Sequence, residues 1–451
     1  MIAWTRLAFN NRVALLTAAG LAVGFWPVMA ARQGLRSIAL PALFTLALTF
    51  FWRGLQKIES GDWRLETNKS PDHLPTSHFS LFTFHFFLAG LLLGLTVYTY
   101  IPARGLWLLF PALLLVGGVW DRRWLRRAWG GTAVTLLLAG VLAWPLFAYL
   151  RANPGAEIRL DELSAPLIAA RQGDLSLLWA NIKGGLAIFT FAGDTAWRYN
   201  IPERPLLGLV MGGLFYLGIG VALWRVASGK GQVWGVAGRN GRLAYAAALI
   251  WLVGGLAPVL ITGPELSMTQ GMGMQPVVYL LVAVAIDWLW QLATVNSQRS
   301  MANDQLTIGN WLLTIGALLL FGATAVITAR DYFGSWANAP EVRVQYESTM
   351  TAVLNYLAGQ NVSETAVSTI TPGEFHTPAV AVLTLPRDAV QPRWFDGRSS
   401  LIVPNADEAL VVFSGFAPLP EALRPYLATA VLQDTLSLRP TDADRPVWVY
   451  Q

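Results

Sequence analysis

The chain contains no cysteine and few charged residues. None of its 451 residues is Cys, which excludes a scaffold held together by disulfides. Charged residues make up 13% of the chain, whereas about a quarter of a typical soluble domain is charged. The 54% hydrophobic and 12% aromatic content excludes disorder, coiled coil and collagen. This composition indicates a membrane protein.

Long apolar runs occupy the first 330 residues. Nine of them are about 16–22 residues long, close to the length that crosses a hydrocarbon core of about 30 Å. We expect each to be helical, because an unpaired backbone amide in hydrocarbon costs several kcal/mol. The predicted spans are 13–31, 37–52, 80–100, 105–120, 130–150, 205–224, 243–262, 276–295 and 310–329.

Lys and Arg beside the short loops predict the orientation. The N-terminal segment, the loops after the second, fourth and sixth spans, and Arg299 hold fifteen basic residues, all placed on one side by alternation. The opposite short loops hold three, Arg32, Arg36 and Arg104. The N-terminus is therefore predicted to be cytoplasmic and the C-terminal segment external. The net charge of +5 reflects these dispersed signals, and no basic helix or aromatic-basic platform points to nucleic acid.

The first long external segment, 151–204, contains two features at the membrane surface. Leu175 to Ile188 has the pattern of a helix that is apolar on one side, which favours an interfacial position. The following run, Phe191 to Pro205, is dense in polar and aromatic groups. Residue types alone favour an interfacial anchor for this run, and the alternative is one wall of a site for a lipid-borne phosphate.

The second external segment, 331–451, is predicted to be a small α/β domain. Helical patterns appear at 345–359 and 420–428, and strand-like runs at 365–370, 400–403, 409–414 and 446–450. No metal cluster, glycine-rich phosphate loop or recognisable His/Asp/Ser set is visible in it. The predicted fold class is thus an α-helical multi-span membrane domain, 1–330, followed by an external α/β domain.

Four stretches of the chain resemble one family of membrane enzymes. They are Ala89 to Arg104, Trp26 to Ser37, Gly193 to Pro205 and Trp394 to Arg398. They are similar to segments of bacterial membrane glycosyltransferases of the GT-C class, the branch labelled glycosyltransferase family 39, which includes relatives of protein O-mannosyltransferases and lipid A aminoarabinose transferases. The resemblance implies a bacterial plasma-membrane enzyme of the cell envelope.

Such enzymes move a hexose or pentose, with inversion, from a polyprenyl phosphate to an acceptor on the outer face. The displacement needs a carboxylate as base and positive charge for the departing phosphate. By resemblance, Arg104 and Arg198 are the leading phosphate ligands, and Asp194 is the candidate acid. The alternative for both arginines is a general anchor among lipid headgroups. The full set of candidate binding residues is Arg32, Arg36, Tyr100, Arg104, Trp197, Arg198, Asn200, Glu265 and Gln270.

The chain departs from the family in two places. Its first helix resembles the third of its relatives, so the N-terminal hairpin and its acidic loop are expected to be missing. Relatives tend to carry a basic residue within the stretch from Gly263 to Pro276, where this chain offers Glu265, Thr269 and Gln270. A neutral amide cannot replace that charge, so both departures predict weakened catalysis.

Three hypotheses remain open at this point. The first is a glycosyltransferase whose partners are a polyprenyl-phosphate-linked sugar and membrane lipids. It has no assigned cofactor, with a divalent metal ion left open. The second is a non-catalytic binding or assembly protein of the same fold. The third, a transporter or flippase, is disfavoured by the odd number of spans and the scarcity of buried charge.

Overall fold

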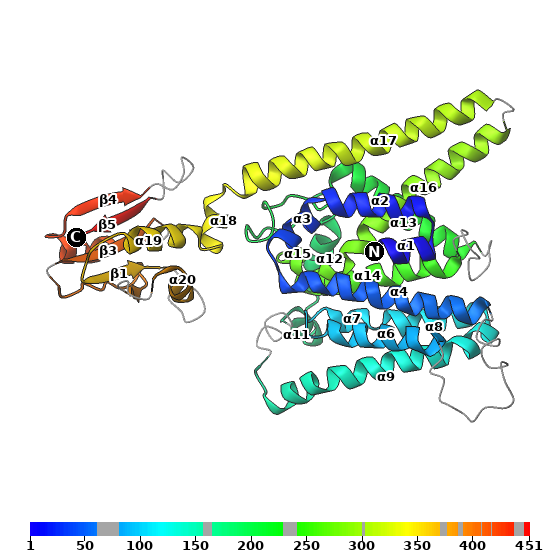
Figure 1. Cartoon of the computed structure of the whole chain (residues 1–451), viewed down its shortest axis with the longest axis horizontal. Helices are drawn as coiled ribbons and strands as arrows, with labels where there is room; N and C mark the ends of the chain where they lie inside the picture. The colour runs from blue at the N-terminus through cyan, green and yellow to red at the C-terminus, as the bar shows by residue number, and fades with distance from the viewer. Residues whose placement is uncertain are drawn as a thin grey trace. The chain divides into compact units, whose positions relative to one another are not determined.

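The computed structural model describes residues 1–60, 81–156, 165–228, 241–299, 303–369, 377–386, 391–406, 408–415, 417–436 and 446–451. The chain divides into two compact units, Met1–Tyr332 and Phe333–Gln451 (Figure 1). The first unit is helical and the second contains a sheet. Each unit has its own buried core.

The first unit consists of helices and their connections. Most of the long helices lie side by side with similar axes (Figure 1). The helices of this unit are α1 (Ile2–Ala8), α2 (Asn11–Val23), α3 (Phe25–Arg32), η1 (Arg36–Ile38), α4 (Ala39–Ser60), α6 (Leu81–Thr96), α7 (Ala103–Leu106), α8 (Leu109–Trp120), α9 (Arg122–Ala152), α11 (Ala165–Arg171), α12 (Ser176–Ala187), α13 (Gly208–Ala227), α14 (Arg242–Thr262), α15 (Ser267–Gln270), η2 (Met272–Met274), α16 (Gln275–Arg299), α17 (Asn303–Ala329) and the beginning of the π-helix η3 (Arg330–Trp336).

Among the described residues, seven helices are long and apolar enough to cross a membrane, and they match seven of the nine predicted spans. An eighth span results if the bent pair α2 and α3 counts as one. A helix is also present in the predicted range Leu175 to Ile188, as α12. The seven are Arg36–Glu59, Ala103–Trp120, Arg122–Ala152, Gly208–Ala227, Arg242–Thr262, Met272–Thr294 and Trp311–Trp336.

The predicted span 13–31 is not one straight helix, because α2 and α3 meet at an angle of 61°. The break is at Gly24, which has an extended backbone. Pro27 lies in the first turn of α3 and has no N–H to offer the carbonyl of Val23, four residues earlier, so a straight helix through this point is disfavoured. A Cβ on Gly24 would stand 2.1 Å from the Tyr279 hydroxyl oxygen. Only glycine allows this approach.

The predicted span 80–100 is also too long. Helix α6 ends at Thr96, four residues before the predicted end of this span. Residues 97–99 form a turn. Ser80 and the preceding residues, with predicted topology signals at Arg64 and Lys69, lie outside the described residues, as do Lys230 and Arg239.

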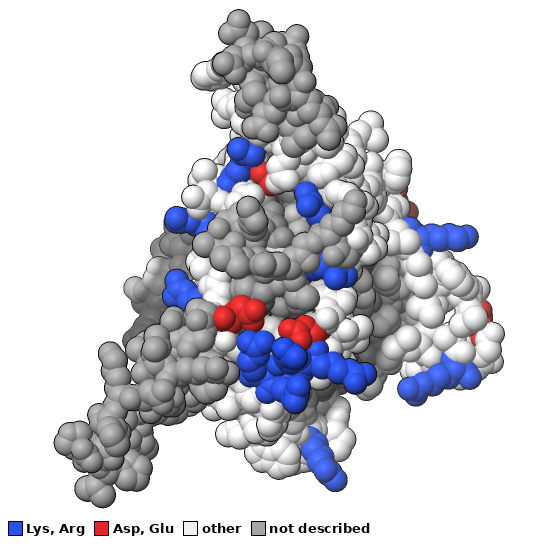
Figure 2. Space-filling view, turned by 90° about the vertical axis from the view of Figure 1, so that its right-hand side faces the viewer, with Lys and Arg blue, Asp and Glu red and all other residues white. Residues whose placement is uncertain are grey.

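One end of the helical unit gathers basic side chains, as Figure 2 shows in blue. Helix α2 begins at this end and α16 ends there, where Arg12 forms an ion pair of 3.1 Å with Asp287. Helices α13 and α14 meet where Arg242 donates to the carbonyl of Val226 at 2.7 Å. We call this the basic end. The positive-inside rule predicts that it faces the cytoplasm.

Aromatic side chains fill the middle of the helical unit. Trp4 packs edge-on against Trp52 and Trp251, and Phe44 packs against Trp251 and Phe110. Helix α16 is buried on all sides over residues 277–286, as expected for a central helix. In contrast, only 6% of the apolar window in α17 is buried. Most of the described part of helix α17 is therefore exposed at the surface of the unit.

The second unit is built on a five-stranded mixed sheet of order β2-β1-β3-β5-β4. Strand β1 pairs in parallel with β2 and β3, whereas β5 is antiparallel to β3 and β4. Helices α19 and α20 pack on one face through a shared apolar core. The strands are β1 (Glu364–Ser368), β2 (Arg393–Phe395), β3 (Ala409–Ser414), β4 (Leu432–Leu436) and β5 (Val447–Tyr450), and the helices are α18 (Pro340–Gln345), α19 (Ser348–Ala358), α20 (Thr377–Thr384) and η4 (Glu421–Leu427).

The predicted elements of this unit agree with the structure in part. Strands β3 and β5 and helix α19 lie within the predicted ranges, β1 begins one residue before its predicted range, and the predicted helix at 420–428 is the 3-10 helix η4. The predicted strand at 400–403 is wrong: Leu401 and Ile402 instead pack against the sheet face opposite α19. The segment has the apolar pattern of a strand because these two side chains cover that face of the sheet. Ile370 lies outside the described residues.

Candidate functional site

Four connections come together at the end of the helical unit opposite the basic end. They join α3 to α4, α6 to α7, α9 to α13 and α14 to α16. We call this end the site end. All residues of the predicted site lie in these connections or at the helix ends next to them. The positive-inside rule predicts that the site end faces outward, opposite the basic end.

Asp194 joins two of these connections. Its carboxylate accepts hydrogen bonds from the backbone N–H groups of Ala196 at 2.9 Å, Leu266 at 3.1 Å and Met268 at 3.0 Å. The side chain is fully buried. Burial raises the pKa of Asp194, and the three backbone donors oppose this rise. Because its oxygens already accept three hydrogen bonds, Asp194 is better suited to holding the loops together than to removing a proton.

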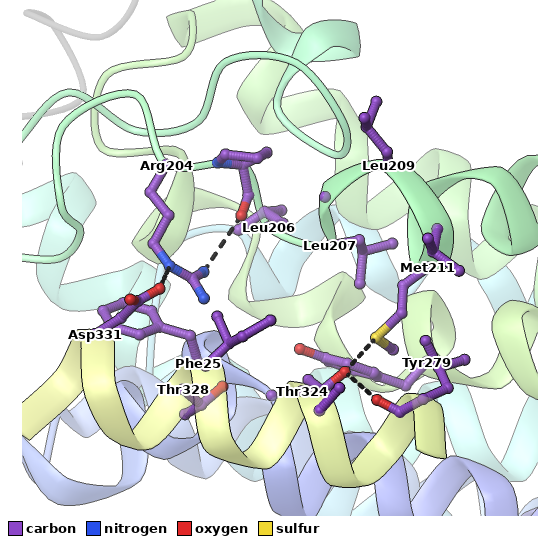
Figure 3. Close-up of a pocket in the computed structure, with 17 residues that line it drawn as sticks. Phe25, Arg204, Leu206, Leu207, Leu209, Met211, Tyr279, Thr324, Thr328 and Asp331 are labelled. Carbon is purple, nitrogen blue, oxygen red and sulfur yellow. Dashed lines mark hydrogen bonds and ion pairs between the residues drawn. The ribbon is translucent and has the colours of Figure 1, made fainter. Parts of the chain in front are cut away.

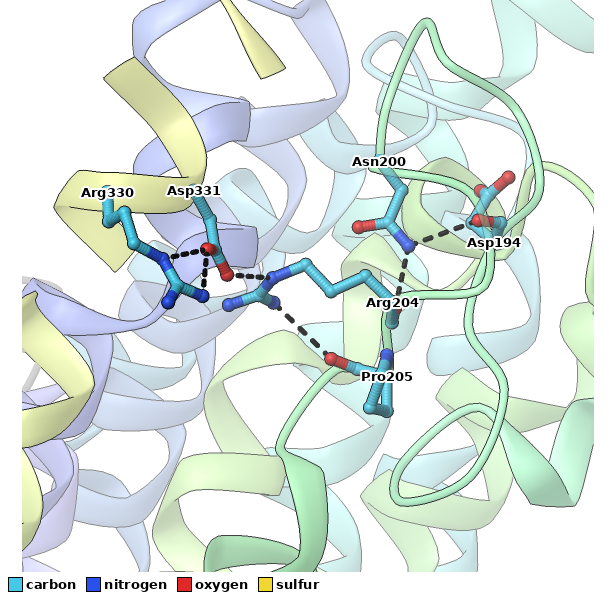
Figure 4. A network of polar contacts seen from close by, with 6 residues as sticks. All are labelled: Asp194, Asn200, Arg204, Pro205, Arg330 and Asp331. Atoms are coloured by element: carbon cyan, nitrogen blue, oxygen red, sulfur yellow. Dashed lines mark hydrogen bonds and ion pairs between the residues drawn. The ribbon is translucent and has the colours of Figure 1, made fainter. Parts of the chain in front are cut away.

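Asn200 closes the same loop from within. Its side-chain NH₂ donates to the carbonyl of Asp194 at 3.1 Å and to that of Arg204 at 2.7 Å (Figure 4). Gly193 lies so close to the Arg204 carbonyl that a Cβ would stand 1.9 Å from the oxygen. The polar run that ends at Pro205 is thus a compact, internally bonded loop.

The other candidates of this loop lie at its surface. Arg198 is exposed, with its guanidinium 5.7 Å from the Tyr199 ring centroid, and Trp197 is half-buried. The Gln33 side chain donates to the Arg198 carbonyl at 3.1 Å, which brings the end of α3 next to this loop. The exposed Arg32 lies over Tyr332 at 5.5 Å.

Arg104 and Gln270 line one apolar cavity of about 320 Å³. The Arg104 guanidinium also lies 5.1 Å from the ring centroid of Phe147, and Gln270 is buried. These two candidates are far apart in the sequence but meet at the site end. The remaining lining residues are mostly apolar: Ile101, Pro102, Gly105, Leu167, Gly254, Ala257, Pro258, Ile261 and Thr262.

Three further candidates lie outside this cavity lining. Tyr100 is half-buried in the turn before α7, and Arg36 is exposed at the start of η1. Glu265 is exposed, and its negative charge contributes to the raised pKa of Asp194. The structure therefore places the candidates around one end of the unit and brings Arg104 and Gln270 together in one cavity.

Sequence reasoning missed an ion pair at this end. Arg204 Nε lies 2.9 Å from Asp331, which also accepts from Arg330 at 2.9 Å (Figure 4). The Arg204 guanidinium packs 4.3 Å from the ring centroid of Phe25. The one local signal was Asp331 itself, an acid directly after an apolar span, where an uncompensated charge is costly.

A second cavity, of about 420 Å³, lies beneath this ion pair (Figure 3). Helices α13 and α17 form its walls, and Arg204 and Asp331 line it at the site end. Two buried hydroxyl groups that line it, those of Tyr279 and Thr328, have no hydrogen-bond partner among the described residues. Among the residues that the structure describes, no three His, Asp or Glu side chains are grouped to hold a metal ion.

The comparisons with known proteins give one similar structure. No protein-family model and no curated protein matches the chain. The archaeal oligosaccharyltransferase AglB from Archaeoglobus fulgidus, in complex with an inhibitory peptide and a dolichol-phosphate, is similar to it with 13% identity and a TM-score of 0.47. The match covers 87% of this chain and 51% of that one, so the chain spans about half the length of AglB. The long apolar helices define an integral membrane protein.

Proposed function

We propose that this protein is a membrane glycosyltransferase that uses a polyprenyl-phosphate-linked sugar at the outer face of a bacterial plasma membrane. The observation that carries the proposal is the apolar cavity lined by Arg104 and Gln270 at the site end. An isoprenoid tail requires an apolar wall, and a phosphate requires a cation near headgroup depth. Arg104 supplies that cation, and its fork of donors fits two phosphate oxygens.

In this proposal the site-end loops arrange the donor. Asp194 fixes the 193–205 loop to the turn at Leu266 and Met268, close to Gln270. Gln270 offers an amide donor to the departing phosphate, and Arg104 offsets its charge. The exposed Arg198 is placed to meet the donor or acceptor from solvent. Asp194 has a structural role here and is not the base.

A direct binding measurement tests the proposal. Purified protein is titrated with polyprenyl phosphate, and the bound fraction is followed by native mass spectrometry. We expect Arg104→Gln to weaken binding by about tenfold to a hundredfold, because a charge-assisted hydrogen bond is lost. Binding by Arg104→Lys should be intermediate between that of the wild type and that of Arg104→Gln. The matched control is Arg151→Gln, which removes an exposed arginine at the end of α9, away from the cavity.

Sugar transfer separates the enzyme from the second candidate, a non-catalytic binding protein of the same architecture. Transfer from a radiolabelled lipid-linked sugar, lost in Arg104→Gln, supports the enzyme. Binding without transfer by the wild type supports the binding protein, which the family departures at Gly263 to Pro276 favour. Absence of both binding and transfer would overturn the proposal.

A further inference from the structure

The cavity between α13 and α17 contains two hydroxyl groups that lack a partner. Tyr279 is 2% exposed and Thr328 is 5% exposed, and both side chains line the cavity. Neither hydroxyl oxygen makes a hydrogen bond to any described residue. A buried hydroxyl without a partner is costly, so each is expected to meet a polar group of something bound in the cavity. Thr324, by contrast, donates to the Leu320 carbonyl at 2.7 Å.

The cavity lining is arranged in layers along α17 (Figure 3). Asp331, paired with Arg204, forms a charged layer at the site end. Thr328 lies three residues earlier, about 4.5 Å deeper at the helical rise of about 1.5 Å per residue. Leu320, which also lines the cavity, lies two further turns down the helix. From the site end inward, the cavity therefore offers charge, then hydroxyl groups, then hydrocarbon.

The charged layer carries a net positive charge. Arg204 and Arg330 both contact Asp331, so two guanidinium groups accompany one carboxylate. The Arg330 side chain is 73% exposed, which leaves it accessible to a headgroup at the surface. An anionic group is thus favoured over a neutral or cationic one at this position.

We propose that this cavity binds an anionic glycerophospholipid, with its phosphate at Arg204 and Arg330 and its ester carbonyls at the Tyr279 and Thr328 hydroxyls. In such a lipid the ester groups lie between the phosphate and the acyl chains, which is the order of the layers. A polyprenyl phosphate has hydrocarbon directly after its phosphate and leaves both hydroxyls unpaired. The lipid is a bound partner of the fold, separate from the donor site at Arg104.

Matched lipids test the assignment of each layer. The purified protein is incubated with phosphatidylglycerol, and retention of the lipid is measured by native mass spectrometry. Phosphatidylcholine tests the charge. Dialkyl phosphatidylglycerol, which has ether links in place of the esters, tests the carbonyls. We expect each change to weaken binding by about tenfold, since it removes net charge or two neutral hydrogen bonds. Inorganic phosphate in excess should not displace the lipid, because it lacks the chains.

Variants locate the contacts in this cavity. The double variant Tyr279→Phe, Thr328→Val keeps the cavity shape and should bind diacyl and dialkyl phosphatidylglycerol equally, about tenfold more weakly than the wild type binds the diacyl form. Thr314→Val is the matched control, a threonine on the same helix outside the cavity. Thermal unfolding without added lipid checks the fold, and the double variant should be at least as stable as the wild type.

Three results would overturn this proposal. The first is that the wild type retains the diacyl and dialkyl forms of phosphatidylglycerol equally. The second is that it retains phosphatidylcholine as well as phosphatidylglycerol. The third is that it retains polyprenyl phosphate more strongly than phosphatidylglycerol and that the double variant abolishes this retention. Displacement by inorganic phosphate would show an anion site without a lipid. Because Arg104→Gln leaves this cavity intact, loss of donor binding there and loss of phospholipid binding here are distinguishable.

Discussion

The Asp194 carboxylate accepts a hydrogen bond of 3.0 Å from the backbone N–H of Met268, which lies 74 residues further along the chain. This contact fixes the loop before α13 against the turn before α16. The two connections join different pairs of helices, and each contains candidate site residues. Their relative position therefore depends in part on one buried carboxylate.

Asp194→Asn tests this dependence. The amide keeps one acceptor but turns an NH₂ group toward a backbone N–H, so two donors face each other. We expect a loss of about 2–3 kcal/mol in the free energy of unfolding, the cost of an unsatisfied buried polar group. Thermal unfolding in detergent measures it. Asp174→Asn is the control, because Asp174 accepts from the Ser176 N–H in an exposed position. An equal effect of both variants would contradict the assignment.

Asp396 gives the second unit a predictable response to acid. Arg398 donates to its carboxylate from Nε at 2.9 Å and from Nη2 at 2.7 Å, and these contacts lower the pKa of Asp396 below 3.8. A lowered pKa in the folded state means that the stabilisation is present above 3.8 and is lost as pH falls through the folded pKa. Wild type should therefore lose more stability than Asp396→Asn between about pH 5 and pH 3. Thermal unfolding across that range is the measurement, and parallel curves would refute the prediction.

The Arg204–Asp331 pair should contribute more than an exposed ion pair. The side chains are 18% and 11% exposed. A double-mutant cycle with Arg204→Met and Asp331→Asn is expected to give a coupling energy of about 1–3 kcal/mol. The exposed pair Arg393–Glu364, 57% and 31% exposed, is the internal comparison and should give about 0–1 kcal/mol. Equal coupling energies would mean that burial does not strengthen the first pair.

The parts of the fold that the sequence predicted are those with a local signal. Length and hydropathy are properties of a single segment, so seven spans were found directly. The break at Gly24 also had a local cause in Pro27, which a count of apolar residues ignores. Strand β4 (Leu432–Leu436) was missed because it is mostly exposed, and β2 (Arg393–Phe395) because three residues are too few to show alternation.

The site was less predictable because its contacts join distant segments. Motif resemblance pointed to Asp194 and Gln270, but no local pattern indicates that the Asp194 carboxylate accepts from Leu266. The same holds for Arg204 and Asp331, separated by 127 residues. Each of these residues has an ordinary local explanation, as an interfacial or flanking charge. Their pairing becomes visible only when the helices are packed.

Gly24→Ala tests the close approach at the bend between α2 and α3. The added Cβ would stand 2.1 Å from the Tyr279 hydroxyl, so we expect a loss of about 1–3 kcal/mol from overpacking. Tyr279→Phe should rescue part of that loss, because it removes the clashing atom. Gly130→Ala in α9 has open space around its Cβ and should stabilise by about 0.5–1 kcal/mol. The measurement is thermal unfolding of the wild type, Gly24→Ala, Gly24→Ala combined with Tyr279→Phe, and Gly130→Ala. If Tyr279→Phe restores none of the stability lost in Gly24→Ala, the contact is contradicted.

Filling the Arg104 cavity should separate stability from ligand binding. Ala257 lines that cavity, and Ala257→Leu adds apolar atoms to an apolar space. Each buried CH₂ contributes about 0.8 kcal/mol, so the unfolding temperature should stay equal or rise. Polyprenyl-phosphate binding should fall by at least about tenfold, because the added side chain occupies the volume of the tail. Ala323→Leu fills the other cavity and serves as the matched control. If Ala257→Leu binds the lipid as the wild type does, the donor tail lies elsewhere.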